Sequence, residues 1–189
     1  MDHDDSFSTE NLLDRELLFA LGSTSSLQQK VTQVFQLLRD PVYRYMFRAL
    51  QNQQEAEDLT QEVFLRLYTC LHQGQGIKNI RAWVFRVAHD LAIDRQKRKL
   101  VLGHLDVTLW DLTQDPAPGA EQRLLDEDKD KRLHRALAQL SSREKECLEL
   151  RAEGLSYQEI ADVLEMRLPT LVKFLGRIIK KLAREVSRD

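Results

Sequence analysis

Two stretches of helical pattern, separated by a segment that cannot be helical, limit how this chain folds. Apolar residues recur at helical spacing from Leu27 to Lys99 and again from about Leu124 to Val186. Between them lies Asp115-Pro116-Ala117-Pro118-Gly119, where proline removes an amide donor and restricts the residue before it. No stretch of useful length alternates with period two. The sequence therefore predicts an all-α protein with two helical domains joined by a flexible linker.

The distribution of charge along the sequence indicates where the domain boundaries lie. From Gly103 to Asp128 the chain has seven acidic residues and one arginine, and their repulsion favours a solvated linker. The prediction is a polar arm over residues 1–26, which is either disordered or one weak helix, and a helical bundle over 27–99. An acidic Pro/Gly linker follows over 100–127, and a second helical domain covers 128–189. We expect the domains to move nearly independently and proteases to cut between about Leu100 and Arg123.

Four helices are predicted in the first domain, and the first of them begins near Leu27 with the apolar stripe Val31, Val34, Phe35 and Leu38. Asp40-Pro41 is typical of an N-cap followed by proline in the first turn, so one helix should start there. The next covers about Gln54 to Leu71, and the loop His72–Asn79 follows it. The last runs from Ile80 to Lys99, and its predicted core stripe is Val84, Val87, Ala88 and Leu91.

The second domain has the pattern of a helix-turn-helix. Ser141 with Glu144, and Ser156 with Glu159, are capping boxes that mark two helix starts, and Gly154 separates them. Pro169 lies in the first turn of a final helix that reaches about Val186. In this layout the second helix of the motif enters the DNA major groove.

The helix from Ile80 to Lys99 has the residue types that bind an unstacked single strand. From Ile77 to Lys99 there are seven Lys or Arg against two Asp. Aromatic rings stack on bases and cations neutralise phosphates. Core packing is an equally open role for its tryptophan. The candidate DNA-binding residues are Arg81, Trp83, Phe85, Arg86, Arg95, Lys97 and Arg98.

The final helix and the turn before it are cationic, which suits phosphate contacts and salt-sensitive binding. A solvated helix of an ordinary bundle is the alternative. The stretch Val172, Phe174, Leu175 and Gly176 offers no side chain that reads base edges, although its apolar face around Phe174 could meet a protein. The candidate DNA-binding residues here are Arg167, Thr170, Lys173, Arg177, Lys180 and Lys181.

A mostly acidic ridge lies on the predicted 54–71 helix, opposite its apolar stripe. It consists of Glu55, Asp58, Gln61 and Glu62. The ridge is either the solvent-exposed side of the helix or a surface that contacts another protein. No histidine or nucleophile motif accompanies these carboxylates, so an active site is not expected.

The remaining composition predicts no enzyme, no cofactor and no metal. Cys70 and Cys147 lie in helices of different domains, too few for a zinc site or a disulfide framework. No apolar run approaches the ~20 residues that span a bilayer, so we expect no membrane insertion. The acidic start of the chain lacks a secretory signal, and we expect a cytoplasmic protein.

Three runs resemble conserved regions of the sigma-70 family of RNA polymerase sigma factors. Two of them are similar to region 2: Ala56-Glu57-Asp58-Leu59-Thr60-Gln61-Glu62-Val63-Phe64, and Ala82-Trp83-Val84-Phe85-Arg86-Val87-Ala88 with Ile93-Asp94. The third is similar to region 4: Leu140-Ser141-Ser142-Arg143-Glu144, continued by Leu150-Arg151-Ala152-Glu153-Gly154-Leu155-Ser156-Tyr157-Gln158-Glu159-Ile160-Ala161. Chain length and the direct linker resemble the extracytoplasmic-function (ECF) group.

The resemblance implies core RNA polymerase and promoter DNA as partners, and it leaves an anti-sigma factor open as another. The acidic ridge would bind the clamp helices of the largest polymerase subunit. The Arg81–Lys99 helix and the loop before it, close to an extruded base, would open and hold the −10 element. The C-terminal domain would contact the −35 element and the polymerase flap. The family performs no covalent chemistry.

The sequence departs from the family in three places. His89-Asp90 stands where Arg-Asn is frequent, and Glu165 stands where the turn usually has glycine. From Leu168 to Gly176 only Thr170 and, approximately, Leu171 and Leu175 match the usual pattern. Two alternatives therefore stay open beside an ECF sigma factor: a stand-alone helix-turn-helix regulator, and a sigma-like protein that binds polymerase without driving transcription.

Overall fold

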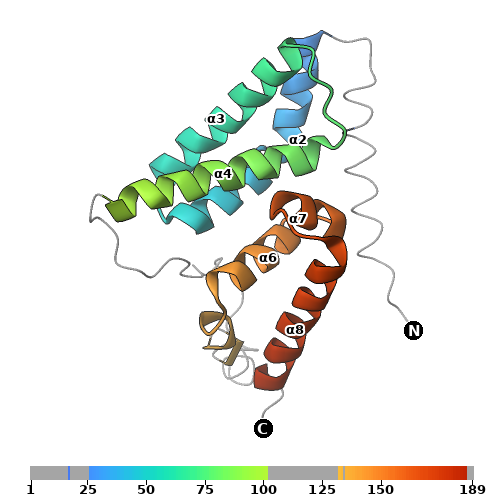
Figure 1. Ribbon diagram of the computed structural model, residues 1–189. Helices are drawn as coiled ribbons and strands as arrows, with labels where there is room; N and C mark the ends of the chain where they lie inside the picture. The colour runs from blue at the N-terminus through green and yellow to red at the C-terminus, as the bar shows by residue number, and fades with distance from the viewer. Residues whose placement is uncertain (1–16, 18–25, 102–131, 134, 187–189) are drawn as a thin grey trace, which may run out of the picture.

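The computed structural model describes residue 17, residues 26–101, residues 132–133 and residues 135–186. Most of the predicted arm and nearly all of the predicted linker lie outside these residues. Within them there are helices and no strand, as the sequence predicted. Two groups of helices follow each other along the chain (Figure 1).

The N-terminal domain consists of α2 (Leu27–Leu50), α3 (Gln53–His72) and α4 (Ile80–Val101). Figure 1 shows α4 running across α2 and α3. Ser26 and Gln29 form a capping box at the start of α2, and Asn52 caps α3 through the amide of Glu55. The fully buried side chains Val34, Leu38, Met46, Val63 and Phe85 belong to all three helices and form one core.

The prediction of a helix start at Asp40-Pro41 is wrong. Pro41 lies inside α2, which continues from Leu27 to Leu50. Proline in a helix interior costs about 3 kcal/mol through the lost amide donor and the clash with the preceding turn. Leu38 and Val42, on either side of Pro41, are both completely buried. Tertiary packing of these neighbours offsets the local preference for a break.

The C-terminal domain consists of α6 (Ser142–Ala152), α7 (Tyr157–Val163) and α8 (Leu168–Val186), preceded by helical residues 132–133 and 135–138. Both predicted capping boxes are present, at Ser141 and Ser156. Gly154 has φ +80°, which permits the turn between α6 and α7. The predicted helix-turn-helix layout is therefore confirmed, and Leu155, Ile160, Leu171 and Ile178 fill its core.

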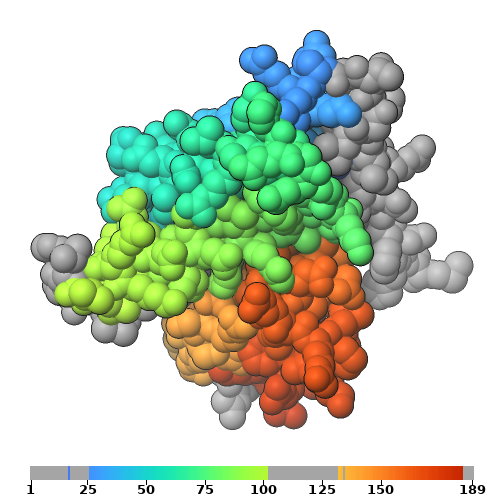
Figure 2. Space-filling view, turned by 45° about the horizontal axis from the view of Figure 1, so that its top comes forward, coloured from blue at the N-terminus to red at the C-terminus, as the bar shows by residue number. Residues whose placement is uncertain are grey.

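The two domains pack directly against each other. α7 contacts α4, and Figure 2 shows no separation between their surfaces on that face. Ion pairs link α2 to the C-terminal domain, as described below. This packing differs from the expectation of two nearly independent domains. Cations of α2 form ion pairs with carboxylates of the C-terminal domain, and these pairs hold the two domains together.

Candidate nucleic-acid interface

The inner face of α4 belongs to the core. Phe85 is fully buried and meets the ring of Tyr45 edge-to-face, with the ring centroids 5.9 Å apart. A ring in this position cannot stack on a base. The assignment of Phe85 to DNA binding is therefore wrong, and its role is to fix α4 on α2.

Trp83 lies differently, partly buried at the edge of a cavity. The cavity has a volume of about 390 Å³, and the loop between α3 and α4 forms part of its wall. Cys70, Lys78, Trp83 and Arg86 line it from the N-terminal domain, and Asp162 lines it from α7. An aromatic ring and two cations thus border a hollow next to the predicted strand-binding helix.

The cations of α4 fall into two groups. Lys97 and Arg98 are exposed at the C-terminal end of the helix, and Arg95 is partly exposed. Arg81, in contrast, is buried, and its Nη2 donates to the carbonyl of Glu153 at 2.9 Å. Arg86 donates to the carbonyl of Asp162. The first group is open to solvent, whereas the second contacts the C-terminal domain.

His89 is a core residue, which the sequence did not indicate. Its Nδ1 lies 2.9 Å from the hydroxyl of Tyr45, and burial lowers the pKa of His89. The family departure at His89 therefore affects the packing of α4 on α2 rather than charge on an exposed face.

The acidic ridge follows one side of α3. Asp58 and Gln61 are exposed. Glu62 is ion-paired with Arg66 on the next turn at 2.7 Å, and Glu55 reaches Lys99 of α4 at 2.6 Å. The carboxylates at both ends of the ridge are thus paired with cations, and one end is joined to α4.

The cationic face of α8 borders a shallow groove of about 680 Å³. Thr170, Lys173, Arg177 and Lys180 lie along it, and Arg177 stands 5.6 Å above the ring of Phe174. Arg167 is exposed in the preceding turn. Lys181 differs, because its Nζ donates to the carbonyl of Gln139 at 2.9 Å. Most of the predicted set shares one face, while Lys181 also holds the domain together.

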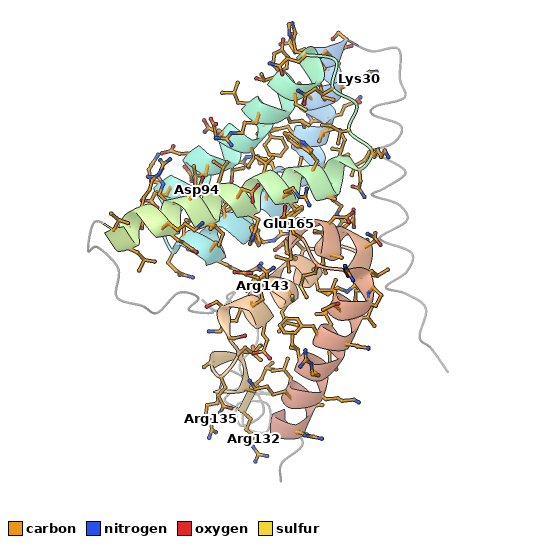
Figure 3. The ribbon with its side chains drawn as sticks, viewed as in Figure 1. Lys30, Asp94, Arg132, Arg135, Arg143 and Glu165 are labelled. Atoms are coloured by element: carbon orange, nitrogen blue, oxygen red, sulfur yellow. The ribbon has the colours of Figure 1, made fainter. Side chains whose placement is uncertain are left out.

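Glu165, in the turn of the helix-turn-helix, adopts the left-handed backbone conformation with φ +53°. Glycine has this conformation at low cost, and other residues adopt it rarely. Figure 3 shows Glu165 and Arg143 near the end of the C-terminal domain that faces α4, and Arg132 and Arg135 at the opposite end.

An ion-pair cluster between the domains went unpredicted. Arg44 and Arg48 of α2 bind Glu153, with N–O distances of 2.7 and 2.6 Å, and Arg48 also binds Glu149 at 2.9 Å. The Glu153 side chain is only 1% exposed. Burial alone would lower the pKa of Arg48, but Glu149 and Glu153 outweigh it and raise that pKa. Glu149 of α6 and Glu153, which caps the end of α6, had no sequence signal beyond that of an ordinary charged helix.

The comparisons with known proteins agree with this geometry. Residues 34–100 match the model of sigma-70 region 2, and residues 130–182 match that of sigma-70 region 4. SigX, an ECF RNA polymerase sigma factor of Bacillus subtilis, is 31% identical over 147 residues, which cover 70% of this chain and 73% of SigX. The chain belongs to the ECF group of sigma-70 family sigma factors.

Further relatives support the same assignment. The RNA polymerase sigma factor YlaC of Bacillus subtilis is 27% identical over 78% of this chain and 87% of its own length. The fold is similar to RpoE of Bartonella quintana, solved in complex with the anti-sigma factor NepR. The TM-score is 0.60 at 21% identity, covering 84% of this chain and 97% of that one. CnrH, solved with the cytosolic domain of CnrY, gives a TM-score of 0.56 at 18% identity, covering 93% and 95%.

This ECF sigma factor thus binds core RNA polymerase and promoter DNA in transcription initiation. Sigma factors are in general non-catalytic regulators of transcription. Family membership also excludes the alternative of a stand-alone helix-turn-helix regulator.

Among the described helices, none is long and apolar enough to cross a membrane. Both cysteines are free thiols, and burial raises the pKa of Cys147 to about 12.

Proposed function

We propose that this sigma factor selects promoters chiefly through its N-terminal domain, while its C-terminal domain binds DNA mainly through phosphates. The observation that carries this proposal is the exposed face of α8. It combines cations with a threonine and a glycine, and has none of the amide side chains that read adenine.

In the N-terminal domain, α3 binds core polymerase and α4 binds the −10 strand. The ridge Glu55, Asp58, Gln61 and Glu62 on α3 binds the clamp helices of core polymerase. Arg95, Lys97 and Arg98 hold the phosphates of the melted −10 strand along α4. Trp83 and the adjacent cavity receive an unstacked base, because an aromatic face and cations suit a single strand.

At the −35 element, Lys173 and Arg177 lie four residues apart on one face of α8 and reach the DNA backbone. Thr170, Lys180 and Arg167 extend the same contact. Lys181 contributes charge near this face while it holds the Gln139 carbonyl. Each phosphate contact adds salt-dependent affinity without sequence preference.

A −35 substitution scan in a reconstituted promoter assay tests this division. We expect a shallow scan, because phosphate contacts are the same on every sequence. Lys173→Ala and Arg177→Ala should weaken binding on all sequences and reduce the salt slope by about one each. Arg39→Ala, an exposed cation of α2, is the matched control and should change neither quantity. A sharp preference at two or more −35 positions, removed by either variant, would contradict the proposal.

We also propose an anti-sigma factor as a partner and the cytoplasm as the site of action. RpoE supports the first part because it was solved with the anti-sigma factor NepR, and CnrH supports the second because it was solved with the cytosolic domain of CnrY. Affinity purification of the full chain from its native cells tests it. Recovery of core polymerase subunits alone, under every growth condition tried, would count against an anti-sigma factor.

A further inference from the structure

Three arginines of the N-terminal domain bind one end of α6. Glu153, the C-cap of α6, has a side chain that is only 1% exposed. Arg44 donates to its Oε2 from Nη2 at 2.7 Å, and Arg48 donates to its Oε1 from Nη1 at 2.6 Å. Arg48 also pairs with Glu149, one turn earlier, at 2.9 Å. Arg81 donates to the backbone carbonyl of Glu153 at 2.9 Å.

This arrangement suits the C-terminal end of a helix. The last carbonyls of a helix lack partners within it and form the negative end of its dipole, which favours nearby cations. Arg81 binds one such carbonyl. Two arginines four residues apart on α2 meet two carboxylates four residues apart at the end of α6. Charged hydrogen bonds of this kind are stronger than neutral ones, so the site selects the side chains as well as the helix end.

The residue that follows the helix end is also restricted. Gly154 has φ +80°, and a Cβ atom added to it would come within 2.8 Å of the Arg81 Nη2. A side chain there would push Arg81 away from the Glu153 carbonyl, and the backbone conformation itself favours glycine. The site therefore fits a helix that ends in two carboxylates four residues apart and is followed directly by glycine.

The chain cannot keep α6 in this site while it holds a whole promoter. The −10 and −35 elements lie about 25 base pairs apart, which is about 85 Å of duplex. Both α4 and α8 contact α7, a helix of seven residues, so the docked chain is too short to bind both elements. Residues 102–131, fully extended, span up to about 100 Å and permit the separation. This step alone rests on the proposed function.

We propose that Arg44, Arg48 and Arg81 form a docking site for a partner protein that carries such an acidic helix end. Within the described residues, Arg44 and Arg48 form ion pairs only with Glu149 and Glu153. Departure of α6 therefore leaves two like charges one turn apart on α2, which is unfavourable. The partner's carboxylates replace those of α6. The site is separate from the α3 ridge and from α8, so it adds a partner to those of the proposed function.

The probe is a synthetic peptide with the sequence of residues 140–155, which contains α6, its capping box and Gly154. Isolated helices of this length are marginal in water, so a hydrocarbon staple replaces Arg143 and Cys147. Fluorescence anisotropy of the labelled peptide measures its affinity for full-length chains. One comparison peptide has Gly154→Ala, which adds the obstructing Cβ atom without changing the charge. A second has Glu149→Lys/Glu153→Lys.

The receptor is the full-length chain with Glu149→Lys/Glu153→Lys. Like charges against Arg44 and Arg48 then separate the domains and free the site. Small-angle X-ray scattering checks that the domains are apart. Wild type, whose own α6 fills the site, should bind the peptide more weakly.

Two further variants are made in this receptor. Arg44→Gln/Arg48→Gln removes the site. Lys97→Gln/Arg98→Gln, at the exposed end of α4, makes the same change in net charge elsewhere and is the matched control. Any attraction that follows net charge alone is equal for these two variants.

We expect the peptide to bind the control at least about tenfold more tightly than the variant that lacks Arg44 and Arg48. The Gly154→Ala peptide and the lysine peptide should both bind the receptor more weakly than the original. These peptide comparisons use one receptor and do not depend on differences in domain separation.

Equal affinity for the two variants, or no binding to the receptor, would overturn the proposal. Binding of the Gly154→Ala peptide as tight as that of the original would also overturn it. So would a receptor whose domains stay docked, because the site would then not select carboxylates. No arm of the experiment contains promoter DNA, so failure of the proposed function is measured separately, by the −35 scan.

Discussion

Phe85 and Trp83 lie two positions apart on α4, yet their side chains have different neighbours. Phe85 is enclosed by the core, and Trp83 borders the cavity between the domains. The helical pattern did not separate them, because α4 is covered by α2 and α3 on one side and by α7 on another. A helix with several partners has no single apolar stripe from which its faces can be deduced.

Alanine substitutions at these two positions should have opposite signatures. Phe85→Ala should cost about 3–5 kcal/mol of unfolding free energy, because it leaves a cavity in the core. Trp83→Ala should cost less stability and reduce promoter opening, since base stacking is worth about 1–3 kcal/mol. Chemical denaturation and permanganate footprinting on the two variants measure both effects. A large loss of unfolding free energy in Trp83→Ala, with promoter opening unchanged, would show that Trp83 is a core residue.

His89 should make stability depend on pH. Its folded-state pKa is lowered by burial and by Arg143, against the opposing influence of Asp90 and Glu165. The unfolded chain, with a pKa near ~6.5, therefore takes up the proton first, and stability falls as pH drops below that value.

We expect wild type to lose stability between pH ~7 and ~5.5 relative to His89→Gln, which does not titrate. The buried Glu146 and Glu149 have raised pKa values and act in the opposite direction in acid, and they are common to both proteins. Denaturant titrations at several pH values measure the difference. Parallel pH profiles would show that His89 does not carry this linkage.

At the scale of helices, the caps were the most predictable feature. Ser141–Glu144 and Ser156–Glu159 form local hydrogen bonds within one turn, so their sequence spacing was sufficient. The helix start at Pro41 was predicted wrongly because proline alone favours a helix end. Burial of Leu38 and Val42 in the core outweighs that local preference, and it depends on residues far away in the sequence. The contacts of Glu153 with Arg44 and Arg48 were also out of reach, since both partners lie far from it along the chain.

The ridge on α3 carries the prediction for polymerase binding. Asp58→Lys and Glu62→Lys should weaken binding of core polymerase, because they reverse charge on the proposed docking surface. Exposed substitutions usually change stability by less than about 0.5 kcal/mol, so the fold should persist. Asp40→Lys, an exposed aspartate on α2, is the control. Co-purification with core polymerase measures the loss of binding, and circular dichroism checks that the fold persists. Full retention of the double variant would show that the ridge is not the docking surface.

At the scale of the whole molecule, the packing of the two domains determines which candidate DNA-binding residues are accessible. In the docked arrangement Arg81 and Arg86 are engaged, while Arg95, Lys97, Arg98 and the face of α8 stay accessible. The interdomain ion pairs involve the buried carboxylates of Glu149 and Glu153, which salt screens much less than exposed charges, so docking should weaken only modestly as salt rises.

Run-off transcription with purified core polymerase on a library of genomic fragments tests the central claim, promoter selection by the N-terminal domain, most directly. We predict a small set of fragments that are transcribed only when this protein is added. Their start sites should share bases at −10 and have no common −35 sequence. A set that shares a sharp −35 sequence would contradict the assigned division of labour. No transcript above core polymerase alone, from a protein that still binds core, would show a sigma-like protein that does not drive transcription.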